Sequence, residues 1–177
     1  MTSLDRPVAE DPYGKLPPVP SFTLTSPDIT DGSRLPAVYA VDGGNQSPAL
    51  AWSGFPAGTR SFLVNCFDPD APTPSGYWHW TVVDVPGTVT SLDHGAGGHG
   101  GAHLPRGAFH VRSDGGDDGY EGAGPPRGDR AHRYVFAVHA LDVDELGVGP
   151  TTSPAAVAFT ARGHTLARAT LTATYSR

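Results

Sequence analysis

The chain has 177 residues, of which 38% are hydrophobic, which is enough for one compact domain and too few for two ordinary ones. Its 23 glycines and 18 prolines predict a loop-rich fold. The net charge of −6 excludes a typical nonspecific nucleic-acid binder, because few cations are present to replace the counterions on phosphates. The single cysteine, Cys66, excludes an intramolecular disulfide and a multi-thiolate metal site, and it favours a reducing compartment.

The first 20 residues contain five prolines, which remove backbone donors, so we expect an extended arm over residues 1–20. One domain is predicted over residues 21–177. The amino terminus lacks the apolar stretch of a secretory signal, and no window approaches the roughly 20 apolar residues of a membrane span. These features favour a soluble, cytoplasmic protein.

Short apolar runs between Gly, Pro and Asp clusters predict β-strands. They lie at residues 22–24, 49–52, 61–67, 78–85 and 134–141. The runs 61–67 and 134–141 are nearly continuous, which is typical of central strands covered on both faces. A Thr-rich alternating segment, residues 170–175, predicts a last strand.

One helix is predicted near the carboxyl end. Ser153 can cap it, Pro154 suits its first position, and mostly helix-tolerant residues follow over 155–169, with Gly163 as a weak point in the middle. The fold class is therefore mainly β with a helix near the carboxyl end.

The densest group of polar residues begins with Asp68-Pro-Asp-Ala-Pro72 and continues into Gly76-Tyr-Trp-His-Trp80. Extended backbone would place Asp68 and Asp70 on one side, but the prolines favour a turn that splits their roles. One acid could then face a pocket while the other braces the loop; alternatively, both acids only punctuate a turn. We also predict a cis bond between Ala71 and Pro72, which would aim the two acids.

The second passage is Gly124-Pro-Pro-Arg-Gly-Asp-Arg-Ala-His-Arg-Tyr134, a rigid loop that leads into a strand. If the strand has begun at His132, then His132 and Tyr134 share a face and Arg133 points to the other side. A pocket would then gain an imidazole and a phenol. The alternative is a hydrogen-bonded histidine beside a core tyrosine.

These two passages and Trp78-His79-Trp80 resemble the signature regions of the phosphatidylethanolamine-binding protein family, especially its bacterial, Raf-kinase-inhibitor-like branch. The resemblance covers residues 20–177 and implies a central antiparallel sheet, a second smaller sheet and a C-terminal helix. It also implies a pocket for small anions. The ligand-binding residues carried over by motif are Asp68, Pro72, His79, Gly124, Pro125, Pro126, His132 and Tyr134, with Asp70 as a structural acid.

The resemblance implies a non-enzymatic protein that binds phosphorylated or carboxylated ligands, phospholipid head groups among them, without a cofactor. It also suggests inhibition of a kinase or protease and a homodimer. We expect His79→Ala or His132→Ala to weaken anion binding without affecting folding. The alternative is a metal-free enzyme in which Asp68, His79 and His132 catalyse an isomerisation, cyclisation or elimination. A metal site made of these residues with Asp70 is disfavoured, because the resemblance points to metal-free pockets.

Three features depart from the family pattern. Asp84 stands where bacterial members usually carry Asn, and Ser113-Asp114 stands where Asn-Asp is usual. Residues 93–110 hold four histidines, His94, His99, His103 and His110, in a Gly-rich setting. No regular spacing orders them for a metal ion, so we expect a solvated, flexible loop that folding does not require.

Overall fold

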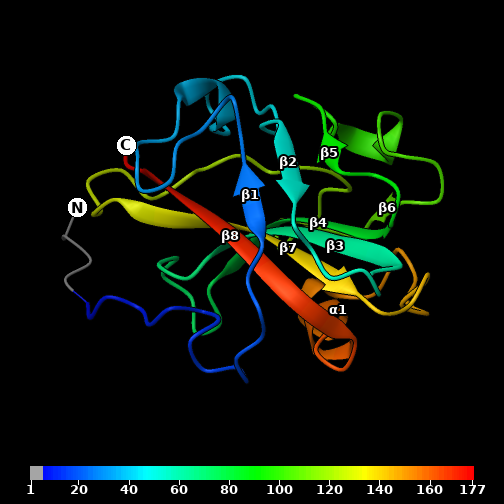
Figure 1. The fold of residues 1–177 in the computed structure, drawn as a ribbon. Helices are drawn as coiled ribbons and strands as arrows, with labels where there is room; N and C mark the ends of the chain where they lie inside the picture. Colours follow the sequence, from blue (N-terminus) through cyan, green and yellow to red (C-terminus); the bar gives the residue numbers. More distant parts are fainter. Residues whose placement is uncertain (1–5) are drawn as a thin grey trace.

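The structure, a computed structural model, describes residues 6–177. In chain order its elements are β1 (Thr23–Thr25), η1 (Ala37–Tyr39), β2 (Leu50–Ser53), β3 (Ser61–Asp68), β4 (Tyr77–Pro86), β5 (Ser91–Leu92), η2 (His99–Gly101), β6 (Phe109–His110), β7 (His132–Leu141), α1 (Pro154–Ala161) and β8 (Thr165–Tyr175). The strands form a small sheet in the order β1-β2-β5 and a larger one in the order β6-β4-β3-β7-β8 (Figure 1). All pairs within these sheets are antiparallel. The mainly β fold class is confirmed.

Strand β3 lies at the centre of the larger sheet, between β4 and β7. Its side chains alternate between two hydrophobic clusters: Phe62 and Val64 belong to the larger cluster, and Leu63 belongs to a second cluster that includes Val157 of α1. All residues of β3 except Phe67 are buried. The prediction of a central strand covered on both faces is confirmed.

The two faces of the larger sheet are covered by different parts of the chain. Leu50 and Trp52 of the small sheet join the cluster around Phe62, and the Trp52 and Phe62 ring centroids lie 5.3 Å apart. The opposite face is covered by α1 and by the segment that precedes β1 (Figure 1). Among residues 6–177, no helix is both long and apolar enough to cross a bilayer.

The predicted helix is too long and the predicted last strand too short. Helix α1 begins at Pro154, with the Ser153 side chain accepting a hydrogen bond from the Ala156 amide at 3.3 Å, but it ends at Ala161. A turn through Gly163 follows, and β8 then pairs with β7 from Thr165 onward. The alternation in β8 buries small and apolar side chains against the core, so pairing in the sheet overrides the local helix propensity.

The arm over residues 6–20 contains no helix or strand, as its prolines predict, but it is packed against the larger sheet. Tyr13 donates its hydroxyl proton to Asn65 at 3.0 Å, and Arg133 donates to the Ala9 carbonyl at 2.7 Å. Residues 1–5, which the arm prediction also covered, lie outside the described residues. The division between arm and domain stays a prediction.

The histidine-rich segment is more ordered than predicted. His110 lies in β6, pairs with Val82 of β4 and is only 7% exposed. The prediction of a solvated loop is therefore wrong for this residue, because β6 extends the edge of the larger sheet. His94 and His99 have exposed side chains that lie 3.2 Å from Asp28 and 3.1 Å from Asp118.

Candidate functional site

A cavity of about 290 Å³ lies where β3, β4 and β7 meet the loop over residues 121–126. Asp68 ends β3, His79 lies near the start of β4, and His132 begins β7. Since β3 pairs with both other strands, these three side chains come together although they are far apart in sequence. All of the predicted ligand-binding residues line the cavity: Asp68, Pro72, His79, Gly124, Pro125, Pro126, His132 and Tyr134.

Six further residues line the cavity and were missed by the sequence analysis: Val41, Ala71, Thr73, Tyr77, Glu121 and Gly122. Three of them, Ala71, Thr73 and Tyr77, lie inside or beside the first signature passage, so proximity in sequence could have suggested them. Val41 comes from a distant segment and is positioned by an isolated bridge between Ala40 and Ala123. No local pattern predicts that contact.

His132 lies between two carboxylates. Its Nδ1 is 2.7 Å from Asp68 Oδ2, and its Nε2 is 2.9 Å from Asp129 Oδ2. An ionised carboxylate only accepts hydrogen bonds, so the two carboxylates favour an imidazolium that donates from both ring nitrogens. Arg6 Nη2 also lies 3.3 Å from Nε2, so this nitrogen faces both a carboxylate and a guanidinium. Burial opposes this charge, but the hydrogen bonds and charges of both carboxylates outweigh burial and raise the pKa of His132. Neither ring nitrogen is therefore left to donate to a ligand.

Asp129 and Arg6 complete this buried cluster, and the sequence analysis did not find either. The Asp129 carboxylate lies 2.9 Å from Arg6 Nη1, and Arg6 also donates to the backbone carbonyl of Asp70. Burial alone would raise the pKa of Asp129, but hydrogen bonds from His132 and Arg6 lower it. Asp129 precedes His132 by three residues, a spacing that could have suggested the contact; the arm position of Arg6 gives no such signal.

Asp70 faces away from the cavity and holds the strand ends together. Its two carboxylate oxygens accept hydrogen bonds from Arg133 Nε at 2.7 Å and Nη2 at 2.8 Å. Burial opposes the charge of Asp70, but these contacts lower the pKa of this carboxyl. The geometry fits the structural role predicted for Asp70, and Arg133 points away from Tyr134 as expected.

The predicted cis bond between Ala71 and Pro72 is absent: among the described residues, every peptide bond is trans. The two acids are oriented by hydrogen bonds instead. Asp68 Oδ1 accepts from the Asp70 amide at 2.7 Å, and the Thr73 amide donates to the Ala71 carbonyl at 2.7 Å. These contacts orient the two acids, which is the effect that the cis bond was expected to have.

His79 is 5% exposed and holds one defined tautomer. Its Nδ1 lies 2.9 Å from the Glu121 carbonyl, which can only accept, so Nδ1 carries the proton. Burial lowers the pKa of His79, partly offset by the charges of Asp68 and Glu121. The neutral ring therefore keeps a lone pair on Nε2, and the ring lines the cavity.

Tyr134 packs edge-on against His79, with ring centroids 5.0 Å apart. Its hydroxyl is buried, and within residues 6–177 it has no partner at hydrogen-bonding geometry. Burial raises the pKa of this phenol strongly, and the nearby amide of Gly124 lowers it only in part. Tyr134 is thus a protonated donor at the cavity whose hydrogen bond is not made within the protein.

A second carboxylate at the cavity, Glu121, is already hydrogen-bonded. Tyr77 donates to its Oε1 at 2.9 Å, and Ser113 donates to its Oε2 at 2.7 Å. Burial and the contact with Glu121 raise the pKa of Tyr77, which keeps this phenol protonated. Nowhere in the described part of the chain do three or more His, Cys, Asp or Glu side chains have an arrangement that could hold a metal ion.

Comparison with known proteins agrees with this architecture. A sequence model of the family described as Phosphatidylethanolamine-binding protein matches residues 25–176. The chain belongs to the phosphatidylethanolamine-binding protein family. This membership confirms the resemblance deduced from the two signature passages.

Relatives in this family are similar over most of their length. The UPF0098 protein YbhB of Escherichia coli K12 is 47% identical over 158 residues, which cover 86% of this chain and 99% of YbhB. The crystal structure of E. coli YbcL is described as a new member of the mammalian PEBP family. Its sequence is 44% identical to this chain, and the two structures superpose with a TM-score of 0.86 over 89% of this chain and 99% of the YbcL chain. The family homologue CT736 from Chlamydia trachomatis is 29% identical, with a TM-score of 0.76 over 89% of this chain and 98% of its own.

Proposed function

We propose that this member of the phosphatidylethanolamine-binding protein family is a non-enzymatic binding protein whose cavity takes a small phosphorylated or carboxylated ligand. Phospholipid head groups are the class we favour. The observation that supports this proposal best is the buried hydroxyl of Tyr134, which has no hydrogen-bond partner within residues 6–177 and lies at the same cavity as the neutral ring of His79. A partly protonated phosphate satisfies both, since its P–OH donates to Nε2 and its oxygen accepts from the phenol.

The carboxylates at the cavity restrict the ligand further. Asp68 and Glu121 both line it, so a bare dianion meets repulsion. A ligand that carries an ammonium group beside its phosphate offsets that repulsion, because the ammonium can approach either carboxylate. We therefore expect phosphoethanolamine to bind more tightly than inorganic phosphate.

Calorimetric titration with phosphoethanolamine, inorganic phosphate and ethanolamine tests the proposal. Tyr134→Phe should weaken phosphoethanolamine binding by about 1.5–3 kcal/mol, the contribution of a hydrogen bond to a charged group. The same change removes a buried hydroxyl that has no partner, so the unliganded protein should be as stable as the wild type or more so. Tyr175→Phe, outside the cavity lining, is the matched control. Unchanged affinity in Tyr134→Phe would contradict the assignment of this cavity.

The enzymatic alternative loses support from the surroundings of His132. Acid–base catalysis needs a nitrogen that can gain and lose a proton, whereas both nitrogens of His132 donate to carboxylates. Such a reaction would depend on His79 and Asp68 without His132. The geometry therefore favours binding over proton shuttling.

Three finer expectations from the resemblance are kept as proposals: inhibition of a partner kinase or protease, a homodimer, and a cytoplasmic location. Light scattering of the purified chain tests the homodimer. Fractionation of the source cells tests the location, and assays against candidate kinases and proteases test the inhibition.

A further inference from the structure

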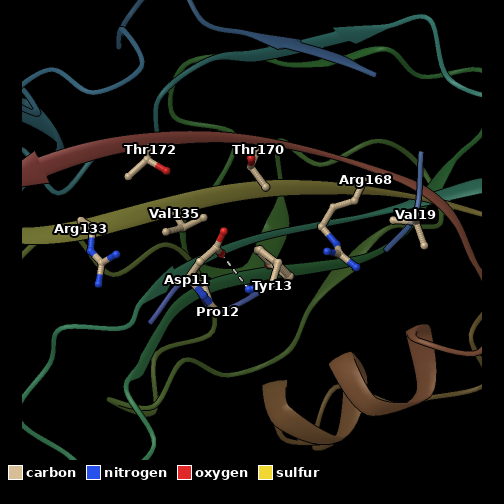
Figure 2. Close-up of a pocket in the computed structure, with 9 residues that line it drawn as sticks. All are labelled: Asp11, Pro12, Tyr13, Val19, Arg133, Val135, Arg168, Thr170 and Thr172. Carbon is tan, nitrogen blue, oxygen red and sulfur yellow. Dashed lines mark hydrogen bonds between the residues drawn. The ribbon is translucent and has the colours of Figure 1, made fainter. Parts of the chain in front are cut away.

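A second cavity, of about 310 Å³, lies on the face of the larger sheet that the arm covers. One side of it is formed by β7 and β8, where alternate residues Arg168, Thr170 and Thr172 share a face of β8. The arm forms the other side, and Figure 2 shows Asp11 and Tyr13 lying against these strands. We call this cavity the arm cleft. Its lining residues are Asp11, Pro12, Tyr13, Val19, Arg133, Val135, Arg168, Thr170 and Thr172.

Arg168 is the unusual group in the arm cleft. Its guanidinium carbon lies 4.3 Å from the centre of the Tyr13 ring, and its Nε is buried without a hydrogen-bond partner. Within residues 6–177, no carboxylate approaches the Arg168 guanidinium within 4 Å. By contrast, the other arginine of the cleft, Arg133, is paired with Asp70. A partly buried guanidinium that only stacks on a ring leaves its planar set of donors available.

Neither His139 nor Asp11 forms an ion pair with Arg168, although the charge of Asp11 acts on its guanidinium. His139 lies opposite Arg168 across the β7–β8 pair, and it accepts a hydrogen bond from Asn65 at 3.3 Å. Burial, with a smaller contribution from the charge of Arg168, lowers the pKa of His139 to about 3, so this ring is neutral. Asp11 is the acidic residue of the cleft, and its Oδ1 already accepts from the Tyr13 amide at 2.9 Å.

We propose that the arm cleft is a second ligand site, which binds a small organic monocarboxylate through the Arg168 guanidinium. The planar donor fork of arginine matches the two oxygens of a carboxylate. Val19, Val135 and the Tyr13 ring provide apolar walls for the body of the ligand. A phosphate dianion is disfavoured because Asp11 repels the additional charge. The site is independent of the phosphate-binding function proposed for the first cavity.

Benzoate is the probe, and benzamide is its uncharged control of nearly the same shape. Calorimetry or fluorescence titration of the full chain should show saturable benzoate binding and much weaker benzamide binding. Arg168→Met keeps most of the side-chain length but removes the donors, and it should weaken benzoate binding by roughly tenfold to a hundredfold. Arg106→Met, an exposed arginine in another part of the chain, should leave the affinity unchanged.

A second variant predicts a change in the opposite direction. Asp11→Asn keeps the oxygen that accepts from the Tyr13 amide but removes the negative charge, so benzoate should bind about twofold to fivefold more tightly. If Arg168→Met releases the arm from the sheet, Asp11→Asn still tests the site. It leaves the stacking of Arg168 on Tyr13 and the other arm contacts in place. Unchanged affinity in Asp11→Asn would then overturn the proposal.

Proteolysis gives a readout that does not depend on titration. Lys15 is the only lysine of the chain and is exposed within the arm, so a lysine-specific protease reports arm accessibility at one bond. Because the ligand contacts both arm and sheet, saturating benzoate should slow this cleavage in the wild type but not in Arg168→Met. Equal binding of benzoate and benzamide would refute the site. Loss of benzoate binding in Tyr134→Phe rather than in Arg168→Met would place the ligand in the first cavity.

Discussion

His132 donates its Nδ1 proton to Asp68 across 2.7 Å, although the two residues are 64 positions apart in the chain. The pair forms because β3 ends at Asp68 and the adjacent β7 begins at His132. Asp129 binds the other ring nitrogen, so one buried cation serves two buried carboxylates. This arrangement makes His132 part of the folded framework of the candidate site.

We predict that His132→Ala lowers the free energy of unfolding by about 3–5 kcal/mol at pH 6.5, because it leaves Asp68 buried without a cation and leaves Asp129 with Arg6 alone. This result would differ from the sequence-based expectation that His132 can be removed without affecting folding. The control is His164→Ala, which breaks an exposed pair with Asp142 and should cost less than about 1 kcal/mol. Urea unfolding of both variants measures the difference.

The same cluster makes the free energy of unfolding of the wild type depend on pH. The folded-state pKa of His132 is raised above its unfolded value of about 6.5, so its stabilisation is fully present below that pH. The stabilisation is then lost as pH rises through the folded-state pKa. We expect the free energy of unfolding to fall from pH 6.5 toward pH 9 in the wild type and in His164→Ala. The absence of this decline in His132→Ala would confirm its source.

Anion binding in the first cavity should be linked to proton uptake by His79. Free His79 is neutral with a lowered pKa, and a bound anion favours the second proton on Nε2. At pH values between the pKa of His79 in the free protein and its pKa in the sulfate-bound protein, sulfate affinity should rise as the pH falls. The rise should be up to about tenfold for each pH unit. Sulfate stays dianionic over this pH range, so the dependence of its affinity on pH reports proton uptake by the protein and not by the ligand. Titrations at pH 6 to 8, in buffers of different ionisation enthalpy, measure both the slope and the proton uptake.

His79→Gln provides the control for this linkage, because its amide can donate to an anion without titrating. Its sulfate affinity should not depend on pH over the same range. A pH slope that persists in His79→Gln would show that another group takes up the proton.

Local patterns predicted the central strands because these depend on nearby residues, and the resemblance to the family supplied eight of the residues that line the first cavity. Asp68 and His79 occur in one passage and His132 and Tyr134 in another, and each passage lies at the end or start of a buried strand. What the sequence could not predict depends on distant contacts. Arg6 reaches Asp129 from 123 residues away, and together with Asp129 it encloses Nε2 of His132, which is then not available to a ligand.

The wrong predictions for the end of α1 and for His110 have a related cause. Residues 165–169 tolerate a helix, but pairing with β7 makes them part of β8. His110 follows a Gly-rich segment that favours a loop, yet the edge of β4 supplies a partner for β6. In both places the hydrogen bonds of the sheet outweigh the local preference, and neither partner strand is adjacent in sequence.

The four histidines of residues 93–110 should differ in their importance for folding. Replacing His94, His99 and His103 together by Asn should change the free energy of unfolding by less than about 1 kcal/mol, because all three residues are exposed. His110 is buried with neither ring nitrogen hydrogen-bonded in the described structure, and burial lowers its pKa. His110→Phe should therefore be tolerated or stabilising, whereas the smaller, polar His110→Asn should cost about 1–3 kcal/mol. Thermal and urea unfolding of these variants measure the effects, and a larger loss in His110→Phe than in His110→Asn would contradict this explanation.

Asp84 offers a test of the departure from the bacterial pattern. It has a positive φ of 57°, a left-handed conformation that Asn adopts readily, and its Oδ1 accepts from the Leu146 amide at 2.9 Å. Burial, with the nearby charge of Glu145, raises the pKa of Asp84. The charged form is therefore disfavoured in the folded state, and this penalty is present above the unfolded pKa of about 3.9 and absent well below it.

Asp84→Asn keeps the accepting oxygen and removes the charge, so it should stabilise the protein by about 0.5 kcal/mol at pH 7. The gain is small because the side chain is only partly buried and solvent screens its charge. The gain should disappear near pH 3, where Asp84 is already protonated. Asp84→Ala, which loses the hydrogen bond to Leu146 and tolerates the left-handed conformation less well, should instead destabilise the protein at both pH values. Urea unfolding at pH 7 and pH 3 separates these effects. A gain for Asp84→Asn that is equal at the two pH values would assign it to backbone conformation rather than to charge.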